Sequence, residues 1–205
     1  MTAVGLIVLA YLAGSLSPSV FLGRLLKGID LREQGSGNAG TTNAFRVLGT
    51  RVGVAVLAGD VLKGFLPVLL ARSLSSPVVT VLVAFAAIAG HNWSVFLRGK
   101  GGKGVATGAG TLLAMTPVIL AVLVTCFLVV LAATGFVSLA SLTAVVLYPI
   151  LVIATGQSLP YVVFALVASG VVVFAHRGNI ARLVHGQERR TRLPWRRSKK
   201  GGPPS

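Results

Sequence analysis

The chain has 205 residues, of which 54% are hydrophobic and 11% are charged, and its mean hydropathy is +0.86. This composition excludes disorder over most of the chain, and recurring apolar runs of about 20 residues argue against a soluble globular domain. The formal net charge of +15 does not indicate nucleic-acid binding, because the basic residues lie at the ends of apolar runs or in the C-terminal tail, as the positive-inside rule describes.

Apolar runs follow one another along the chain at 3–23, 52–71, 77–97, 105–115, 117–133, 136–155 and 159–175. The first run has no basic segment before it and no small-residue cleavage site after it, so we do not expect a removable signal peptide. We end one helix at Thr116 because Pro117 disfavours a helical conformation at the preceding residue. The run 105–115 then covers only about half of a hydrocarbon core. The sequence therefore predicts an all-α, polytopic membrane protein with about seven transmembrane helices, one of them short.

The distribution of basic residues predicts the orientation of these helices. Lysine and arginine gather in loop 24–51, in loop 98–103 and in the tail from residue 177 onward, and none lies between Gly104 and His176. The positive-inside rule places these three segments together on the cytoplasmic side, with the N-terminus outside and the C-terminus inside. We expect residues 1–188 to form a single transmembrane domain. The polybasic segment 189–205 is expected to be a flexible tail that touches anionic lipid.

Three polar segments stand out from this apolar background, and the first is 28–46. Its glycines bring the backbone close to whatever it binds, and Ser36 and Asn38 add short hydrogen-bonding side chains. Arg46 follows near a helix start and contributes a fork-shaped cation. The segment therefore predicts an anion site, with an ordinary glycine-rich turn as the alternative.

The second polar segment, 91–107, places four glycines and the lysines Lys100 and Lys103 just before a helix. Backbone N–H groups and ammonium groups in this arrangement suit a phosphate. It is not a Walker A loop, because Lys103 is followed by Gly104 where that loop has Ser or Thr. The alternative is a tight turn between helices with lysines that extend to the membrane surface.

The third polar segment, 176–188, begins where an apolar run meets water. His176 and Asn179 share one helical face, and a histidine there can transfer protons or bind an oxyanion. An amphipathic interfacial helix is the alternative. No Cys, His and acidic residues cluster with the spacing of metal ligands, so we expect neither a metal site nor a cofactor.

Taken together, the polar segments resemble the PlsY family of bacterial membrane proteins, the acyl-phosphate–glycerol-3-phosphate acyltransferases. The resemblance extends over nearly the whole chain up to residue 188 and is carried by segments 23–38, 60–64, 99–107, 137–141 and 176–183. One departure is Thr41, which stands where the family usually has alanine.

This resemblance implies an enzyme of phospholipid biosynthesis in the bacterial cell membrane, with a cytoplasmic active site. It implies transfer of a fatty acyl group from acyl phosphate to the sn-1 hydroxyl of glycerol 3-phosphate, which gives lysophosphatidic acid and phosphate. No cofactor is implied. The partners implied are the two substrates and membrane lipid, and an enzyme that supplies the acyl phosphate is a further candidate.

The resemblance also implies roles for individual residues. Lys103, His176 and Asn179 are expected to be catalytic. The general base stays open between His176 and the phosphate of the acceptor itself. Substrate binding is expected from Ser36, Asn38, Arg46, Gly101, Gly102, Gly104 and Ser141.

Two other functions use the same features. A membrane transporter of an organophosphate would use the basic loops as a gate, but it predicts polar residues along the membrane path, and 104–175 contains no Lys, Arg, Asp or Glu. A structural membrane anchor for a cytoplasmic partner would not need glycine-lined loops. Acyl transfer is therefore the function that the sequence favours.

Overall fold

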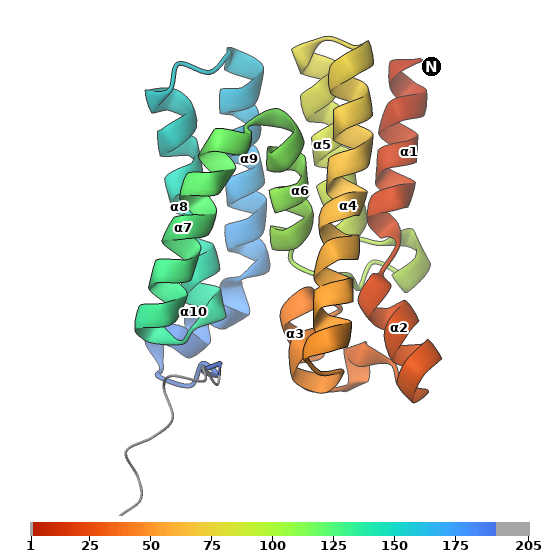
Figure 1. Cartoon of the computed structure of the whole chain (residues 1–205), viewed down its shortest axis with the longest axis vertical. Coiled ribbons are helices and arrows are strands. Elements are labelled where there is room, and N and C mark those ends of the chain that lie inside the picture. The colour runs from red at the N-terminus through yellow and green to blue at the C-terminus, as the bar shows by residue number, and fades with distance from the viewer. Residues whose placement is uncertain (1, 192–205) are drawn as a thin grey trace, which may run out of the picture.

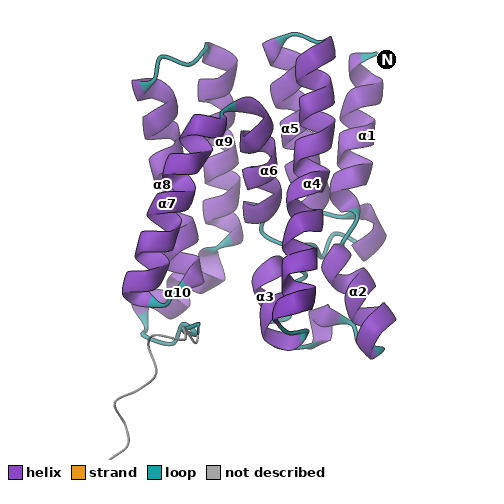
Figure 2. Ribbon diagram, in the orientation of Figure 1, coloured by secondary structure: helices purple, strands orange, loops and turns teal. Residues whose placement is uncertain are grey.

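The computed structural model describes residues 2–191, and over this range its regular elements are all helices (Figures 1 and 2). Two short 3-10 turns, η1 (Leu31–Glu33) and η2 (Val95–Leu97), lie in the loops. The α-helices are α1 (Ala3–Ser15), α2 (Pro18–Lys27), α3 (Thr41–Val47), α4 (Thr50–Leu74), α5 (Pro77–Asn92), α6 (Val105–Met115), α7 (Pro117–Thr134), α8 (Val137–Ala154), α9 (Leu159–Ala175) and α10 (Arg177–Val184).

Within the described range, five segments are long and apolar enough to cross a membrane: Ala3–Lys27, Thr50–Leu74, Pro77–Leu97, Pro117–Thr134 and Val137–Ala154. The pair α9 and α10 qualifies as a sixth if the two helices, bent by 60°, form one span. The shorter apolar helix α6 lies among them, where the sequence predicts a short helix. The prediction of an all-helical protein with several membrane-spanning helices is thus confirmed.

Helix boundaries follow the local sequence signals in most places. The predicted break at Thr116-Pro117 is present, and α7 begins at the proline, which is favourable at a first helical position. The run 3–23, however, is not one continuous helix. The chain leaves the helical conformation at Leu16 and Ser17, and α2 starts at Pro18. The second part is amphipathic, with exposed Phe21 beside basic side chains, as suits a helix near the membrane surface.

Glycines allow the helices near the site to approach very closely. A methyl group built on Gly14 of α1 would lie only 2.2 Å from the carbonyl oxygen of Ala87 in α5. A methyl group on Gly64 of α4 would lie equally close to the carbonyl oxygen of Thr107 in α6. Such contacts between backbones are typical of membrane helices, which gain packing from small residues. They fix α5 and α6, the two helices on either side of the glycine loop, residues 99–104.

The three polar segments lie in the half of the helix bundle that is opposite the N-terminus (Figure 1). The sequence prediction that they share a side of the membrane agrees with this arrangement. The first residues of the predicted flexible tail are in contact with the bundle: Arg189 donates to the Gly35 carbonyl at 3.3 Å, and the Thr191 N–H donates to the Gly135 carbonyl at 2.8 Å. The rest of the predicted tail, 192–205, lies outside the described residues.

Candidate active site

A single buried amide, Asn43 in the first turn of α3, organises the loop that carries Ser36 and Asn38. Its Oδ1 accepts a hydrogen bond from the Ser36 N–H at 3.0 Å. Gly35 has a φ of 63°, and a methyl group there would lie 2.3 Å from the same Oδ1, so the position requires glycine. The loop consequently presents the exposed side chain of Ser36 and the half-buried side chain of Asn38. The Asn43 Nδ2 also lies within 3.1 Å of the carbonyl oxygens of Leu31, Gln34 and Asn38.

Two backbone N–H groups of the glycine loop are already hydrogen-bonded within the protein. The Gly101 N–H donates to the Asn92 carbonyl at 3.1 Å, and the Gly102 N–H donates to the His91 carbonyl at 3.0 Å. These two N–H groups are therefore used inside the protein and do not point to a bound phosphate. The glycines are needed for close packing: a methyl group on Gly101 would lie 1.9 Å from the His91 carbonyl oxygen. The expectation that the glycines of this loop hold phosphoryl oxygens stays a prediction, and at Gly101 and Gly102 the N–H groups are already bonded within the protein.

Lys103 is the group that this loop delivers to the site. The following residue, Gly104, has a φ of 82° and stands at the N-terminal end of α6, so the chain turns sharply just after the lysine. The Lys103 ammonium group donates to the Oδ1 of Asn179, at the start of α10. The second and third polar segments thus meet through two of the residues that the sequence singled out.

Glu188 completes this cluster, although the sequence analysis did not single it out. Its Oε1 accepts hydrogen bonds from Asn179 Nδ2 at 2.6 Å and from Ser138 Oγ at 2.8 Å. Its Oε2 accepts from Arg182 Nε at 2.7 Å. The carboxylate therefore fixes the Asn179 amide so that its oxygen faces Lys103. The only signal in the sequence was the rarity of acids, since Glu188 is one of four.

Two other predicted residues, His176 and Ser141, form hydrogen bonds with backbone carbonyls. His176 is buried at the junction of α9 and α10, and its Nδ1 is 2.8 Å from the Val172 carbonyl oxygen. Because a carbonyl only accepts, Nδ1 carries the proton, and Nε2 keeps a lone pair in the neutral ring. Ser141 donates to the Val137 carbonyl of its own helix at 2.9 Å. In α8 it is Ser138, one turn earlier, that reaches the Glu188 carboxylate.

The charges around Lys103 change its acidity. The pKa of Lys103 is lowered from 10.5 to about 8, chiefly by burial; Glu188 acts to raise it, and the charges of Arg182 and Arg46 also act to lower it. Arg46 itself has a lowered pKa because of burial and the charge of Arg189. Burial acts to raise the pKa of Glu188, but the hydrogen bonds it accepts outweigh burial and lower it. The charges of Arg46, Lys103 and Glu188 therefore influence one another.

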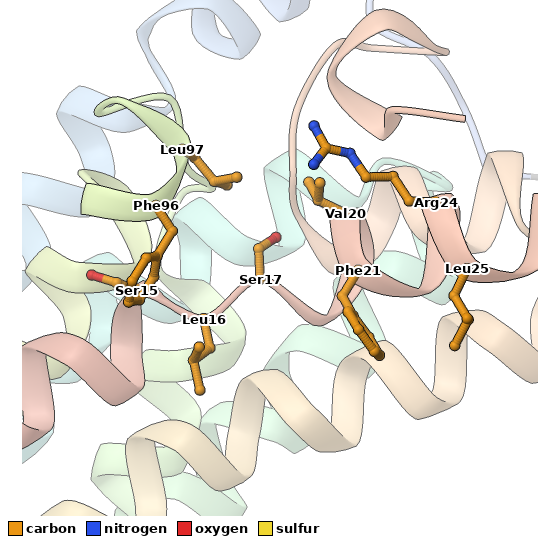
Figure 3. A pocket seen from close by; sticks show the side chains of 9 residues that line it. All are labelled: Ser15, Leu16, Ser17, Val20, Phe21, Arg24, Leu25, Phe96 and Leu97. Atoms are coloured by element: carbon orange, nitrogen blue, oxygen red, sulfur yellow. The ribbon is translucent and has the colours of Figure 1, made fainter. Parts of the chain in front are cut away.

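A cleft of about 180 Å³ opens beside Lys103. Its polar wall includes Asn38 and the glycine loop, and its apolar wall is α9, through Val171 and Phe174. A larger groove of about 490 Å³ lies at the break between α1 and α2, where Ser17, Phe21 and Phe96 line it (Figure 3). The lining of that groove includes none of the predicted site residues, so we place the chemistry in the smaller cleft. A pocket with convergent polar groups and an apolar wall suits an amphiphilic ligand.

The residues of this site can attract and neutralise an anion. Lys103 and Arg46 supply positive charge, Asn38 and Ser36 supply neutral hydrogen-bonding groups, and His176 offers a lone pair for a proton. Among residues 2–191 no group of three or more His, Cys, Asp or Glu side chains could hold a metal ion. The expectation that no metal or cofactor takes part stays a prediction.

Comparison with known proteins points to one family. The family model described as glycerol-3-phosphate acyltransferase matches residues 4–186. A glycerol-3-phosphate acyltransferase 2 of Moorella thermoacetica is 47% identical over 182 residues, which is 89% of this chain and 94% of that protein. A glycerol-3-phosphate acyltransferase of Rubrobacter xylanophilus is 43% identical over 191 residues, covering 93% of this chain and 96% of that protein.

Solved structures agree with these relatives. The glycerol 3-phosphate form of PlsY, an integral membrane glycerol 3-phosphate acyltransferase, superposes with a TM-score of 0.89 at 38% identity and covers 93% of this chain and 96% of that one. The lysophosphatidic acid form gives a TM-score of 0.87 at 37% identity, with 93% and 95% covered. Both the fold and the sequence of the chain therefore resemble PlsY over nearly its full described length.

Proposed function

The chain belongs to the glycerol-3-phosphate acyltransferase family, and we infer that it is itself an integral membrane enzyme that transfers a fatty acyl group to glycerol 3-phosphate. This activity makes it an enzyme of phospholipid biosynthesis. The observation within the molecule that carries the inference is the hydrogen bond from Lys103 to Asn179 beside a cleft that Lys103 and Asn38 line, with the charge of Arg46 acting on Lys103. Transport of an organophosphate is not favoured.

We propose that the phosphate of glycerol 3-phosphate is bound between Arg46 and Lys103, with Ser36 and Asn38 beside it. The lowered pKa of Lys103, caused first by burial, supports this assignment because a desolvated ammonium gains most from an arriving anion. Gly104 contributes the turn that aims Lys103, whereas Gly101 and Gly102 contribute close packing. The Ser141 hydroxyl is bonded to a carbonyl of its own helix, so we assign this residue only to the wall of the substrate site.

Acyl phosphate is the donor we propose. Its reaction does not require a covalent intermediate with the enzyme. The acceptor's sn-1 hydroxyl oxygen forms a bond to the acyl carbon, the bond from that carbon to the phosphate oxygen breaks, and inorganic phosphate leaves. The hydroxyl proton goes either to His176 Nε2 or to the phosphate of the acceptor. Lys103 and Asn179 lie where charge develops on the transferring group, so positioning and electrostatic stabilisation supply the acceleration. The apolar α9 wall of the cleft accommodates the acyl chain.

The proposed topology has seven transmembrane helices, with the short α6 among them. The N-terminus lies outside, and the active site faces the cytoplasm of a bacterial cell. The gathering of basic residues at the polar end of the bundle supports this orientation. A water-soluble acceptor also needs a site at an aqueous face. An enzyme that makes acyl phosphate is the proposed source of the donor.

A liposome assay tests the function. Purified protein is reconstituted, and labelled glycerol 3-phosphate is offered with or without acyl phosphate. We expect label in the lipid fraction as lysophosphatidic acid only when acyl phosphate is present. Label that enters the vesicle lumen unchanged would indicate transport, and label that stays outside in both cases would contradict the proposed activity.

Cysteine labelling tests the topology. The one native cysteine, Cys126, is replaced by serine, and single cysteines are introduced at the exposed positions Glu33, Lys100 and His185. In oriented vesicles an impermeant maleimide should reach all three from the cytoplasmic side only. A cysteine at exposed Ser158, in the loop at the other end of the bundle, is the matched control and should react from the opposite side. Labelling of the first three from different sides would contradict a shared site.

A further inference from the structure

Asp60 is a carboxylate buried inside the helix bundle, and the chemistry proposed above does not use it. Only 1% of its side chain is exposed. Its Oδ1 forms an ion pair with Lys63 Nζ at 2.9 Å, one turn along α4. A buried charge is costly unless it is paired and hydrogen-bonded. The pair with Lys63 therefore explains how the helix bundle can hold the Asp60 carboxylate. That pair does not account for the two further groups that face the carboxylate.

The first of these groups belongs to the loop that carries the phosphate-binding residues. Thr41, the first residue of α3, donates its hydroxyl to Asp60 Oδ2 at 2.9 Å. Asn38 precedes Thr41 by one short turn, and Arg46 lies further along the same helix. The bond therefore fixes the start of the helix that places Arg46.

The second group lies between Asp60 and the glycine loop. His91, near the end of α5, has its Nδ1 3.5 Å from Asp60 Oδ1. The other side of the imidazole lies against Gly102, where a methyl group would be 2.1 Å from Nε2. The His91 carbonyl also accepts the Gly102 N–H. The imidazole is thus held between Asp60 and the residue that precedes Lys103.

We propose that Asp60, acting through Thr41 and His91, is a positioning residue that holds Arg46 and Lys103 at the correct separation for the phosphate of the acceptor. The physical need is clear: two cations that share one anion site repel each other while the site is empty. A connection through a buried carboxylate keeps the loops together during that time and lowers the cost of ordering them on binding. This inference rests on the substrate site proposed above.

Thr41→Val is the decisive variant, because it removes the hydroxyl and leaves the Asp60–Lys63 pair intact. We expect the KM for glycerol 3-phosphate to rise about 3- to 10-fold while kcat changes by less than about twofold, as for the loss of a contact that organises ground-state binding. The melting temperature should stay near that of the parent. Thr125→Val is the matched control, since it removes a hydroxyl bonded only within exposed α7, and its KM should be unchanged.

His91 variants and a distance measurement separate positioning from general damage. His91→Asn keeps a polar group near the position of Nδ1 and should retain a lower KM than His91→Leu. Combining Thr41→Val with His91→Leu should raise the KM by less than the product of the single effects, because both act through Asp60. Spin labels at Glu33 and Lys100, on a Cys126→Ser background, should show a broader distance distribution in Thr41→Val than in the parent.

An unchanged KM together with an unchanged distance distribution in Thr41→Val would overturn the inference and leave the acyltransferase activity standing. A rise in KM that Thr125→Val reproduces would also overturn it. If the parent protein itself transfers no acyl group, the proposed function fails, and the inference falls with it.

Discussion

Lys103→Ala should lower kcat/KM for glycerol 3-phosphate by roughly 100- to 1,000-fold, the loss typical of a preorganised group that stabilises developing charge. The lysine is partly buried, donates to Asn179, and lies in the combined field of Arg46, Arg182 and Glu188. Its removal leaves no other described ammonium group bonded to Asn179. Because burial disfavours the charged form of Lys103, the variant should remain folded, with a melting temperature no lower than that of the parent.

The measurement compares initial rates of acyl transfer in detergent or liposomes at saturating acyl phosphate. Lys27→Ala is the control, because it removes an exposed lysine at the same end of the bundle. Lys103→Arg should recover little of the lost activity, since a planar fork does not replace a compact ammonium in a tight turn. Full activity in Lys103→Ala would remove this residue from the site.

The pH dependence gives a second test of the same lysine. With its pKa at about 8, Lys103 is protonated below that pH and loses its charge as pH rises through it. The parent's kcat/KM, which reports groups of the free enzyme, should therefore fall above pH 8, by up to about tenfold per unit. The decline should disappear in Lys103→Arg, whose guanidinium stays charged. An equally steep decline in that variant would assign the titration to another group.

The helix boundaries that the sequence predicts best are those marked by proline. α6 and α7 meet at Thr116-Pro117 as expected, because proline fixes its own φ and disfavours helix just before it. The break between α1 and α2 carries a similar signal at Pro18, but the surrounding run stays apolar, and hydropathy alone reads it as continuous. Hydropathy records which residues avoid water and is blind to changes in helix direction.

Long-range contacts explain what was missed in the site. Glu188 reaches Ser138, 50 residues earlier, and Asp60 reaches His91 and Thr41 from a different helix. No local spacing encodes such meetings, because they depend on how the helices pack. The residues of the polar segments were predictable since glycine, lysine and histidine are conspicuous in an apolar chain. The direction of backbone N–H groups was not, as Gly102 demonstrates.

Gly102→Ala should abolish most activity, about a hundredfold or more, and should also destabilise the protein. A methyl group on Gly102 would lie 2.1 Å from the imidazole Nε2 of His91, well inside van der Waals contact. Either the imidazole or the loop must shift. Overpacking of this kind costs about 1–3 kcal/mol, and a displacement of about 1 Å at Lys103 is enough for a hundredfold loss of rate.

A double variant distinguishes this collision from direct blockage of a phosphate. His91→Ala removes the imidazole, so Gly102→Ala combined with His91→Ala should regain most of the melting temperature that Gly102→Ala loses on its own. Its KM for glycerol 3-phosphate should stay raised, because the connection from the loop to Asp60 is gone. If the methyl group instead occupied the space of a phosphoryl oxygen, Gly102→Ala would melt like the parent and be inactive, and adding His91→Ala would bring no stabilisation. Melting curves and acyl-transfer rates of the four proteins, measured side by side, decide between a glycine required for packing and one required for binding.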